Sequence, residues 1–268
     1  MPNGFEQFAS SVGKAIETVP DLYNDGLKPA TQESGKTLSL IPRTVNAALV
    51  PLRQWIAYRE YNMAETEILL AQKLEHVGEE KIVTPEPYVA VPAIQAISYS
   101  MNNHELRNLY ANLLAKSMNV DTKDSVHPSF VNIINQMSPI DAQVLKGIME
   151  RNITPLLHIT ISEKEPEGLG GGSSTVEENI TWMTFTDYSI ISISIVNLCR
   201  LGLIEIPPLA SYTTKAHYDC VKNSQKFQNL VSNIKAHMNL DKNEIGFEER
   251  CINKTSLGKS FNQVCMID

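Results

Sequence analysis

The chain has 268 residues, of which 43% are hydrophobic and 20% charged, a composition typical of globular proteins and not of disordered or collagen-like ones. Its 30 Asp and Glu outnumber its 23 Lys and Arg, giving a net charge of -7. This acidity argues against general binding to nucleic acid, which needs a surplus of basic residues. The four cysteines have the spacing of neither zinc knuckles nor a compact disulfide framework. We therefore expect reduced thiols in a cytoplasmic protein, with no metal and no cofactor.

Residues 1–138 are predicted to form a helical domain. Apolar residues recur at helical spacing in 5–19, 38–50 and 51–74, with prolines between these segments. No stretch has the roughly 20 successive apolar residues of a transmembrane helix. Residues 26–57 are poor in acidic residues, rich in small and apolar ones, and contain basic ones. This segment is a candidate for peripheral membrane contact, and the alternative is an ordinary helix pair buried against the central helices.

Two more helices follow a proline-rich connector at 84–87. The first is predicted over 88–101 and the second over 106–118, both from their apolar spacing. Asn102 and Glu105 precede the second helix as a variant capping box, in which the Asn side chain accepts from the backbone and the Glu reaches back.

The next two helices have recognisable starts. His127 and Pro128 introduce an apolar stripe at helical spacing. Ser138 is a good N-cap, and the proline after it suits the first position of a helix. Asp141 falls in that first turn, where a carboxylate complements the helix dipole.

Residues 139–268 are predicted to form an α+β domain that resembles winged-helix domains. A helix ends in Arg-Leu-Gly-Leu-Ile and runs into a short strand, with Leu203 and Ile204 as the wing strand and Gly202 as the helix cap. The predicted fold class is α+β and predominantly α-helical. The elements expected here are a strand at 155–161, a polar loop at 163–179, a strand at 180–186, a helix at 188–201, a strand at 203–206 and a polar helix at 219–239.

The sequence carries no familiar catalytic or cofactor motif. The glycine-rich segment at 168–173 is followed by no lysine and is surrounded by glutamates, which favours a surface loop over a phosphate-binding loop. No histidine pair has a metal-binding spacing, and no nucleophile motif occurs. The helix from Asp187 to Arg200, which would read DNA in a winged-helix domain, offers mostly Ser and Ile.

The central block closely resembles the abortive infection alpha (Abi-alpha) family of bacterial proteins. The resemblance is carried by "NNHELRNLYANLLAKSMN" and "VHPSFVNIINQMSPIDAQVLK", and by the upstream "ALVPLRQWIAYRE" and "VTPEPYVAVPAIQAISYS". It implies a role in abortive infection, in which a cell that detects phage halts or dies before progeny emerge. It implies no catalytic residues. The candidate functional or family-motif positions are Glu105, Arg107, Tyr110, Asn112, Ser117, His127, Pro128 and Asp141.

We therefore predict an anti-phage protein that acts through protein or membrane contacts rather than catalysis. Its partner is expected to be a protein or a phage component, and homo-oligomer formation is a further option. One alternative is a winged-helix regulator that binds DNA. A second is an enzyme with an unrecognised site near His127, Asn112 and Arg107.

Overall fold

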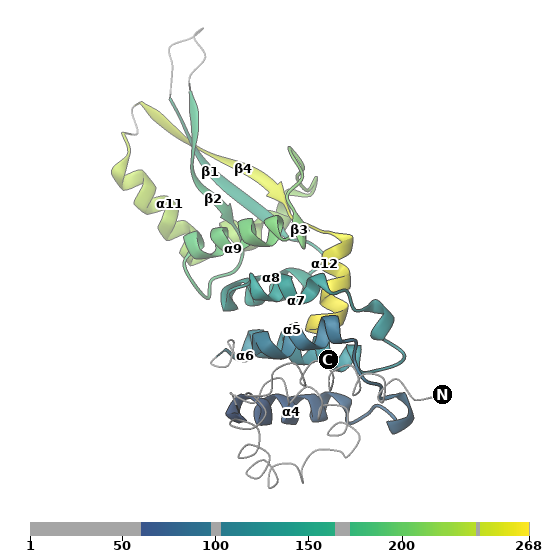
Figure 1. Cartoon of the computed structure of the whole chain (residues 1–268). Coiled ribbons are helices and arrows are strands. Elements are labelled where there is room, and N and C mark those ends of the chain that lie inside the picture. Colours follow the sequence, from purple (N-terminus) through teal and green to yellow (C-terminus); the bar gives the residue numbers. More distant parts are fainter. Residues whose placement is uncertain (1–59, 98–102, 164–171, 240–241, 268) are drawn as a thin grey trace. The chain divides into compact units, whose positions relative to one another are not determined.

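The chain forms two compact units in a computed structural model (Figure 1). The second unit is Ser138–Lys259, and the first holds the described residues up to Met137 together with those from Ser260 onward. The predicted class is confirmed, because the structure is mostly helical and also contains a small antiparallel sheet. Predictions for the first 59 residues, including the candidate membrane segment at 26–57, lie outside the described residues. The structure describes residues 60–97, 103–163, 172–239 and 242–267.

The first unit is helical in its described residues, and α6 is its central element. Helices α4, α5 and α7 and the π-helical turn η6 all pack against α6. Seven successive α6 residues from Leu109 to Ala115 are buried, because neighbours cover the helix on every side. The elements are α4 (Glu60–Leu74), η3 (Glu79–Lys81), α5 (Pro87–Ile97), α6 (His104–Ser117), η4 (Lys123–Ser125), α7 (Ser129–Asn135) and η6 (Asn262–Met266).

The start of α6 differs by one residue from the prediction. Asn103 is the N-cap, and its side-chain oxygen accepts a hydrogen bond from the backbone amide of Leu106 at 3.1 Å. The predicted cap at Asn102 is therefore wrong. Two adjacent asparagines have equal capping chemistry, and the packing of α6, which the local sequence does not contain, decides between them.

The second unit combines helices with two small sheets. Strands β2, β1 and β4 form an antiparallel sheet in that order, and β3 pairs with β5. The elements are α8 (Pro139–Glu150), β1 (Pro155–Glu163), β2 (Ser173–Ile180), α9 (Tyr188–Arg200), β3 (Ile204–Glu205), η5 (Lys215–Tyr218), α10 (Asp219–Lys222), α11 (Gln225–His237), β4 (Asn243–Cys251) and β5 (Asn253–Lys254), and α12 (Ser256–Phe261) ends in the first unit.

Strand β2 corrects two predictions. It occupies the end of the expected loop at 163–179, and it stops at Ile180, where a strand was expected to begin. Most of its side chains are polar and exposed, because β2 lies at the sheet edge and is held by its backbone pairing with β1. Polar side chains are typical of edge strands, and they hide the alternation that identifies a half-buried strand.

The polar helix expected at 219–239 is interrupted. It consists of α10 and α11, and Ser224 between them caps α11 by accepting from the amide of Phe227 at 3.2 Å. The strand expected at 203–206 is present as β3. The finer winged-helix assignment stays a prediction.

Candidate interaction surface

Helix α9 is apolar on two faces, and only one of them is covered. Ile191, Ile195 and Leu198 are fully buried, and α9 contacts both α8 and β2 (Figure 1). This spacing of four and three residues is that of an ordinary core-facing stripe. A helix with a second apolar face is normally buried all round, so the other face of α9 needs an explanation.

The second face is exposed to solvent. Ile190, Ile193 and Val196 are 41%, 70% and 56% exposed, and they follow one another at intervals of three residues on one side of the helix. Phe185, just before α9, is also half exposed. We call the three α9 residues the α9 outer face. Single exposed apolar residues are common, but a contiguous row of them marks an interaction site.

The C-terminal end of α9 is fixed by a chain of polar contacts. The Asn197 side-chain NH2 donates to the Asp141 carboxylate at 3.0 Å, and the Arg200 guanidinium donates to the Asn197 side-chain oxygen at 2.8 and 3.0 Å. Asp141 also completes the capping box of α8, because it accepts from the Ser138 amide at 2.6 Å. One carboxylate thus starts α8 and orients the end of α9.

A second anchor holds the turn that follows α9. Gly202 adopts a φ of 74°, as predicted for a helix-ending glycine. The Thr255 hydroxyl donates to the Gly202 carbonyl at 2.6 Å, and the Lys254 ammonium donates to the Met149 carbonyl at 3.0 Å. The strand pair β3–β5 therefore fixes the exit of α9 against the end of α8.

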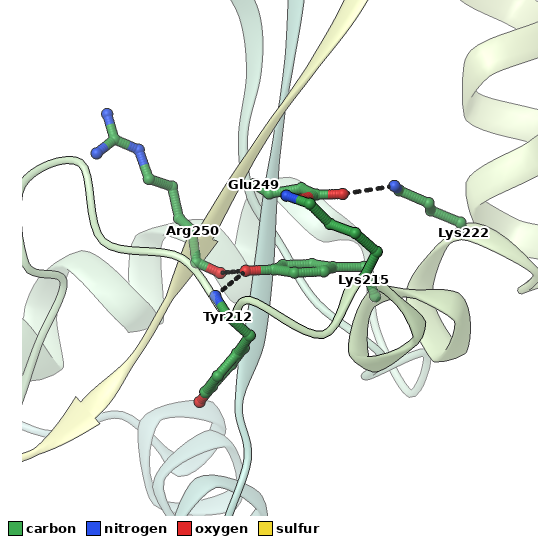
Figure 2. A network of polar contacts seen from close by, with 6 residues as sticks. Tyr212, Lys215, Lys222, Glu249 and Arg250 are labelled. Carbon is green, nitrogen blue, oxygen red and sulfur yellow. Dashed lines mark hydrogen bonds and ion pairs between the residues drawn. The ribbon is translucent and has the colours of Figure 1, made fainter.

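A polar network holds the loop after β3 against β4 (Figure 2). Glu249 of β4 forms ion pairs with Lys215 and Lys222, the latter at 2.8 Å, and its side chain is only 13% exposed. Partial burial acts to raise the pKa of Glu249, but the hydrogen bonds and charges of the two lysines outweigh it. The pKa therefore lies below its ordinary value of 4.5.

The same network contains a tyrosine pair. The Tyr218 hydroxyl donates to the Arg250 carbonyl at 3.0 Å and accepts from the Tyr212 amide at 2.9 Å (Figure 2). The Tyr212 hydroxyl in turn accepts from the Thr154 amide at 2.9 Å. Because Tyr218 is fully buried, these bonds satisfy a hydroxyl that would otherwise destabilise the fold.

The depressed pKa of Glu249 gives a prediction about stability and pH. Glu249→Gln is expected to lower the free energy of unfolding by about 1 kcal/mol at pH 7, a modest value because Lys215 is solvent-exposed. The wild-type carboxylate stabilises the fold fully above pH 4.5. Its contribution falls as pH drops through 4.5 and vanishes below the depressed pKa.

Urea denaturation at several pH values measures this difference. The gap in unfolding free energy between wild type and Glu249→Gln should stay constant at pH values well above 4.5 and narrow as pH falls below 4.5. Glu244→Gln, at an exposed position of the same strand, serves as the control. A gap that stays constant with pH, or equals that of the control, contradicts the assigned role of the lysine pairs.

The candidate positions on α6 use their polar groups inside the first unit. The Tyr110 hydroxyl donates to the Asn135 side-chain oxygen at 2.7 Å, and burial raises the Tyr110 pKa well above its ordinary value. The Asn112 side-chain NH2 donates to the backbone carbonyl of Cys265 at 2.9 Å. The Ser117 hydroxyl donates to the Leu114 carbonyl at 2.7 Å.

The remaining candidate positions lie at helix starts. Glu105 and Arg107 are half-buried in the first two turns of α6. The exposed His127 imidazole accepts from the Ser129 amide at 3.1 Å, and Pro128 is the residue before α7. Asp141 is buried in the second unit, where it caps α8. The hydrogen bonds unite Tyr110 with α7 and Asn112 with η6.

The sequence signalled neither the α9 outer face nor the Glu249 network. The isoleucines of α9 fit a buried stripe on either side of the helix, so periodicity alone could not tell which side is exposed. Glu249 stands between a glutamate and an arginine and has the appearance of one more solvated charge. Its lysine partners lie 34 and 27 residues away, beyond the reach of a local pattern.

In the part of the chain that the structure describes, no helix is both long and apolar enough to cross a membrane. Within the same residues, no three His, Cys, Asp or Glu side chains form a group that could hold a metal ion. Of the four cysteine thiols, Cys251 and Cys265 are buried, and all four are free.

The fold and surface define an α+β protein with an exposed apolar helix face. A family model described as Abortive infection alpha matches residues 58–265. The chain therefore belongs to this family, and the predicted resemblance is confirmed. No curated protein and no solved structure matches the chain.

Proposed function

We propose that the protein takes part in abortive infection, through contacts with protein or membrane rather than through catalysis. Membership of the abortive infection alpha family supports the biological role. The mode of action is our own inference, and it draws on the way the motif residues are used in the fold.

The observation that supports contact over catalysis is the engagement of the motif side chains. Tyr110, Asn112 and Ser117 direct their polar groups to partners in the first unit, and the Asp141 carboxylate caps α8. A catalytic group must instead reach a substrate atom with a hydroxyl, amide or carboxylate. In this protein those groups secure helices, while an apolar surface faces the solvent.

Phage challenge tests the proposal directly. Cells with and without the gene are infected at a low and a high ratio of phage to cells, and culture density is followed. We expect protection at the low ratio and collapse of the culture at the high ratio, because infected cells stop before progeny emerge. Equal densities with and without the gene, across a broad panel of phages, would contradict the proposal.

Two additional readouts separate the modes of action. Entry of a membrane-impermeant dye during collapse would assign the contact to the membrane, and collapse without dye entry would assign it to a protein. His127→Ala tests the enzymatic alternative, since His127 is exposed and its contacts within the described residues are with Ser129 and Phe130, close by in the chain. We expect this variant to retain both protection and melting temperature; loss of protection at an unchanged melting temperature would contradict a non-catalytic mode.

A further inference from the structure

We propose that the α9 outer face binds a second copy of this chain, as an antiparallel pair of α9 helices with a twofold axis at Ile193. The starting point is the exposure of three large apolar side chains in one row, with Ile193 at the centre and the most exposed of them. A twofold axis requires the same patch on both copies to fit itself.

The α9 outer face fits itself in this arrangement. With the axis at Ile193, that residue packs against its own copy, and Ile190 lies opposite Val196 of the second chain. Ser189 lies opposite Asn197, a small polar side chain beside an amide at the edge of the contact. Helix-pair contacts of this kind bury residues three and four apart on one side of each helix.

Charges at the two ends of α9 select the antiparallel direction. Asp187 is exposed at the N-terminal end and makes no capping hydrogen bond with its side chain. Arg200 is exposed at the C-terminal end. An antiparallel pair places Arg200 of one copy near Asp187 of the other, whereas a parallel pair places like charges together. The helix dipoles also favour the antiparallel direction.

The size of the face sets the expected strength. A helix of 13 residues is about 20 Å long, and a single helix pair buries less than the roughly 800 Å² per partner of a standard interface. We therefore expect a reversible dimer with a dissociation constant on the order of micromolar. The second copy is then one partner in the proposed contact mechanism. The biological role of the dimer rests on the proposed function, whereas dimer formation itself does not.

Sedimentation velocity of the purified full chain, over concentrations from about 1 to 200 µM around the expected constant, tests the dimer. We expect Ile193→Asp to raise the dissociation constant by at least about 30-fold, since it places a charge at the centre of the contact. Val176→Asp is the control, because Val176 of β2 is another exposed apolar side chain, at 41%, but lies off α9. It should change the constant less than about 3-fold.

Charge reversal tests the direction of the pair. Asp187→Arg and Arg200→Asp are each expected to weaken the dimer by about 5-fold. The double variant should recover most of the wild-type affinity, because the opposite charges meet again across the axis. Circular dichroism of each variant checks that the helices are retained.

Three outcomes overturn the proposal. They are a monomer at all concentrations, a dimer that tolerates Ile193→Asp, and a double charge reversal that is weaker than either single variant. If the protein is a monomer that co-sediments with vesicles of anionic lipid, and Ile193→Asp abolishes this binding, the α9 outer face binds a membrane instead of a second copy. These measurements use purified protein, so the dimer and the phage phenotype can fail independently.

Discussion

Gly258→Ala is expected to destabilise the second unit strongly, by about 3 kcal/mol. A Cβ atom at this position would overlap the Leu203 carbonyl oxygen and lie 2.8 Å from its carbonyl carbon. Both are backbone atoms of the strand region after α9, held by the hydrogen bond from the Thr255 amide to the Leu203 carbonyl at 3.3 Å. Neither α12 nor the backbone at Leu203 can move away without breaking this hydrogen bond. The overlap therefore strains the folded state.

Thermal melting followed by circular dichroism measures this effect, with a fall of more than about 10 °C expected for a unit of this size. Gly147→Ala in α8 is the matched control. Its Cβ would also meet an atom at 2.8 Å, but that atom is the flexible Cε end of Met183. Alanine also favours a helix by up to about 1 kcal/mol over glycine. Equal stability of the two variants would contradict the close approach of α12 to Leu203.

The sequence predicted those elements whose signals are local. Helix α8 has its cap, proline and acidic first turn within four residues, and its predicted start agrees with the structure. Helix α9 was predicted to within a residue, together with its glycine cap. Strand β2 was missed because it depends on backbone pairing with β1, and its exposed side chains have no alternating pattern.

The candidate interaction surface illustrates a different limit. Periodicity indicates that a helix has an apolar face, but α9 has two, and the choice between them depends on where α8 and β2 lie. For the motif positions, the sequence identifies the residues but does not show which groups they contact. The sequence marked them only as candidate functional or family-motif positions, whereas their partners, such as Cys265 for Asn112, lie up to 153 residues away. Only the folded chain shows that these polar groups serve the core.

Asn112 gives the most direct test of that conclusion. Asn112→Ala is expected to lower the free energy of unfolding by about 2–3 kcal/mol, because it removes a buried donor and leaves the Cys265 carbonyl without it. Asn112 is only 1% exposed, so water cannot replace the lost amide. Urea denaturation followed by circular dichroism measures the loss. A variant as stable as wild type would contradict a structural role for this residue.

Asn112→Asp separates the loss of a donor from the loss of volume. The introduced carboxylate has nearly the shape of the amide but faces the Cys265 carbonyl as an acceptor, so we expect a loss of about 3 kcal/mol at pH 7. Burial raises the pKa of the introduced group above its unfolded value. Protonation restores a donor, so the deficit relative to wild type should shrink as pH falls, whereas the deficit of Asn112→Ala should stay constant.

Asn132→Asp, at an exposed position of α7 in the same unit, is the control and should show neither effect. The comparison also bears on function. If the motif residues act by holding η6 against α6, protection from phage should fall with stability and recover in step with it. If Asn112 instead takes part in chemistry, Asn112→Asp should abolish protection even under conditions where the fold is intact. Protection by Asn112→Asp under conditions where its fold is intact is therefore the readout that distinguishes a core hydrogen bond from a catalytic amide.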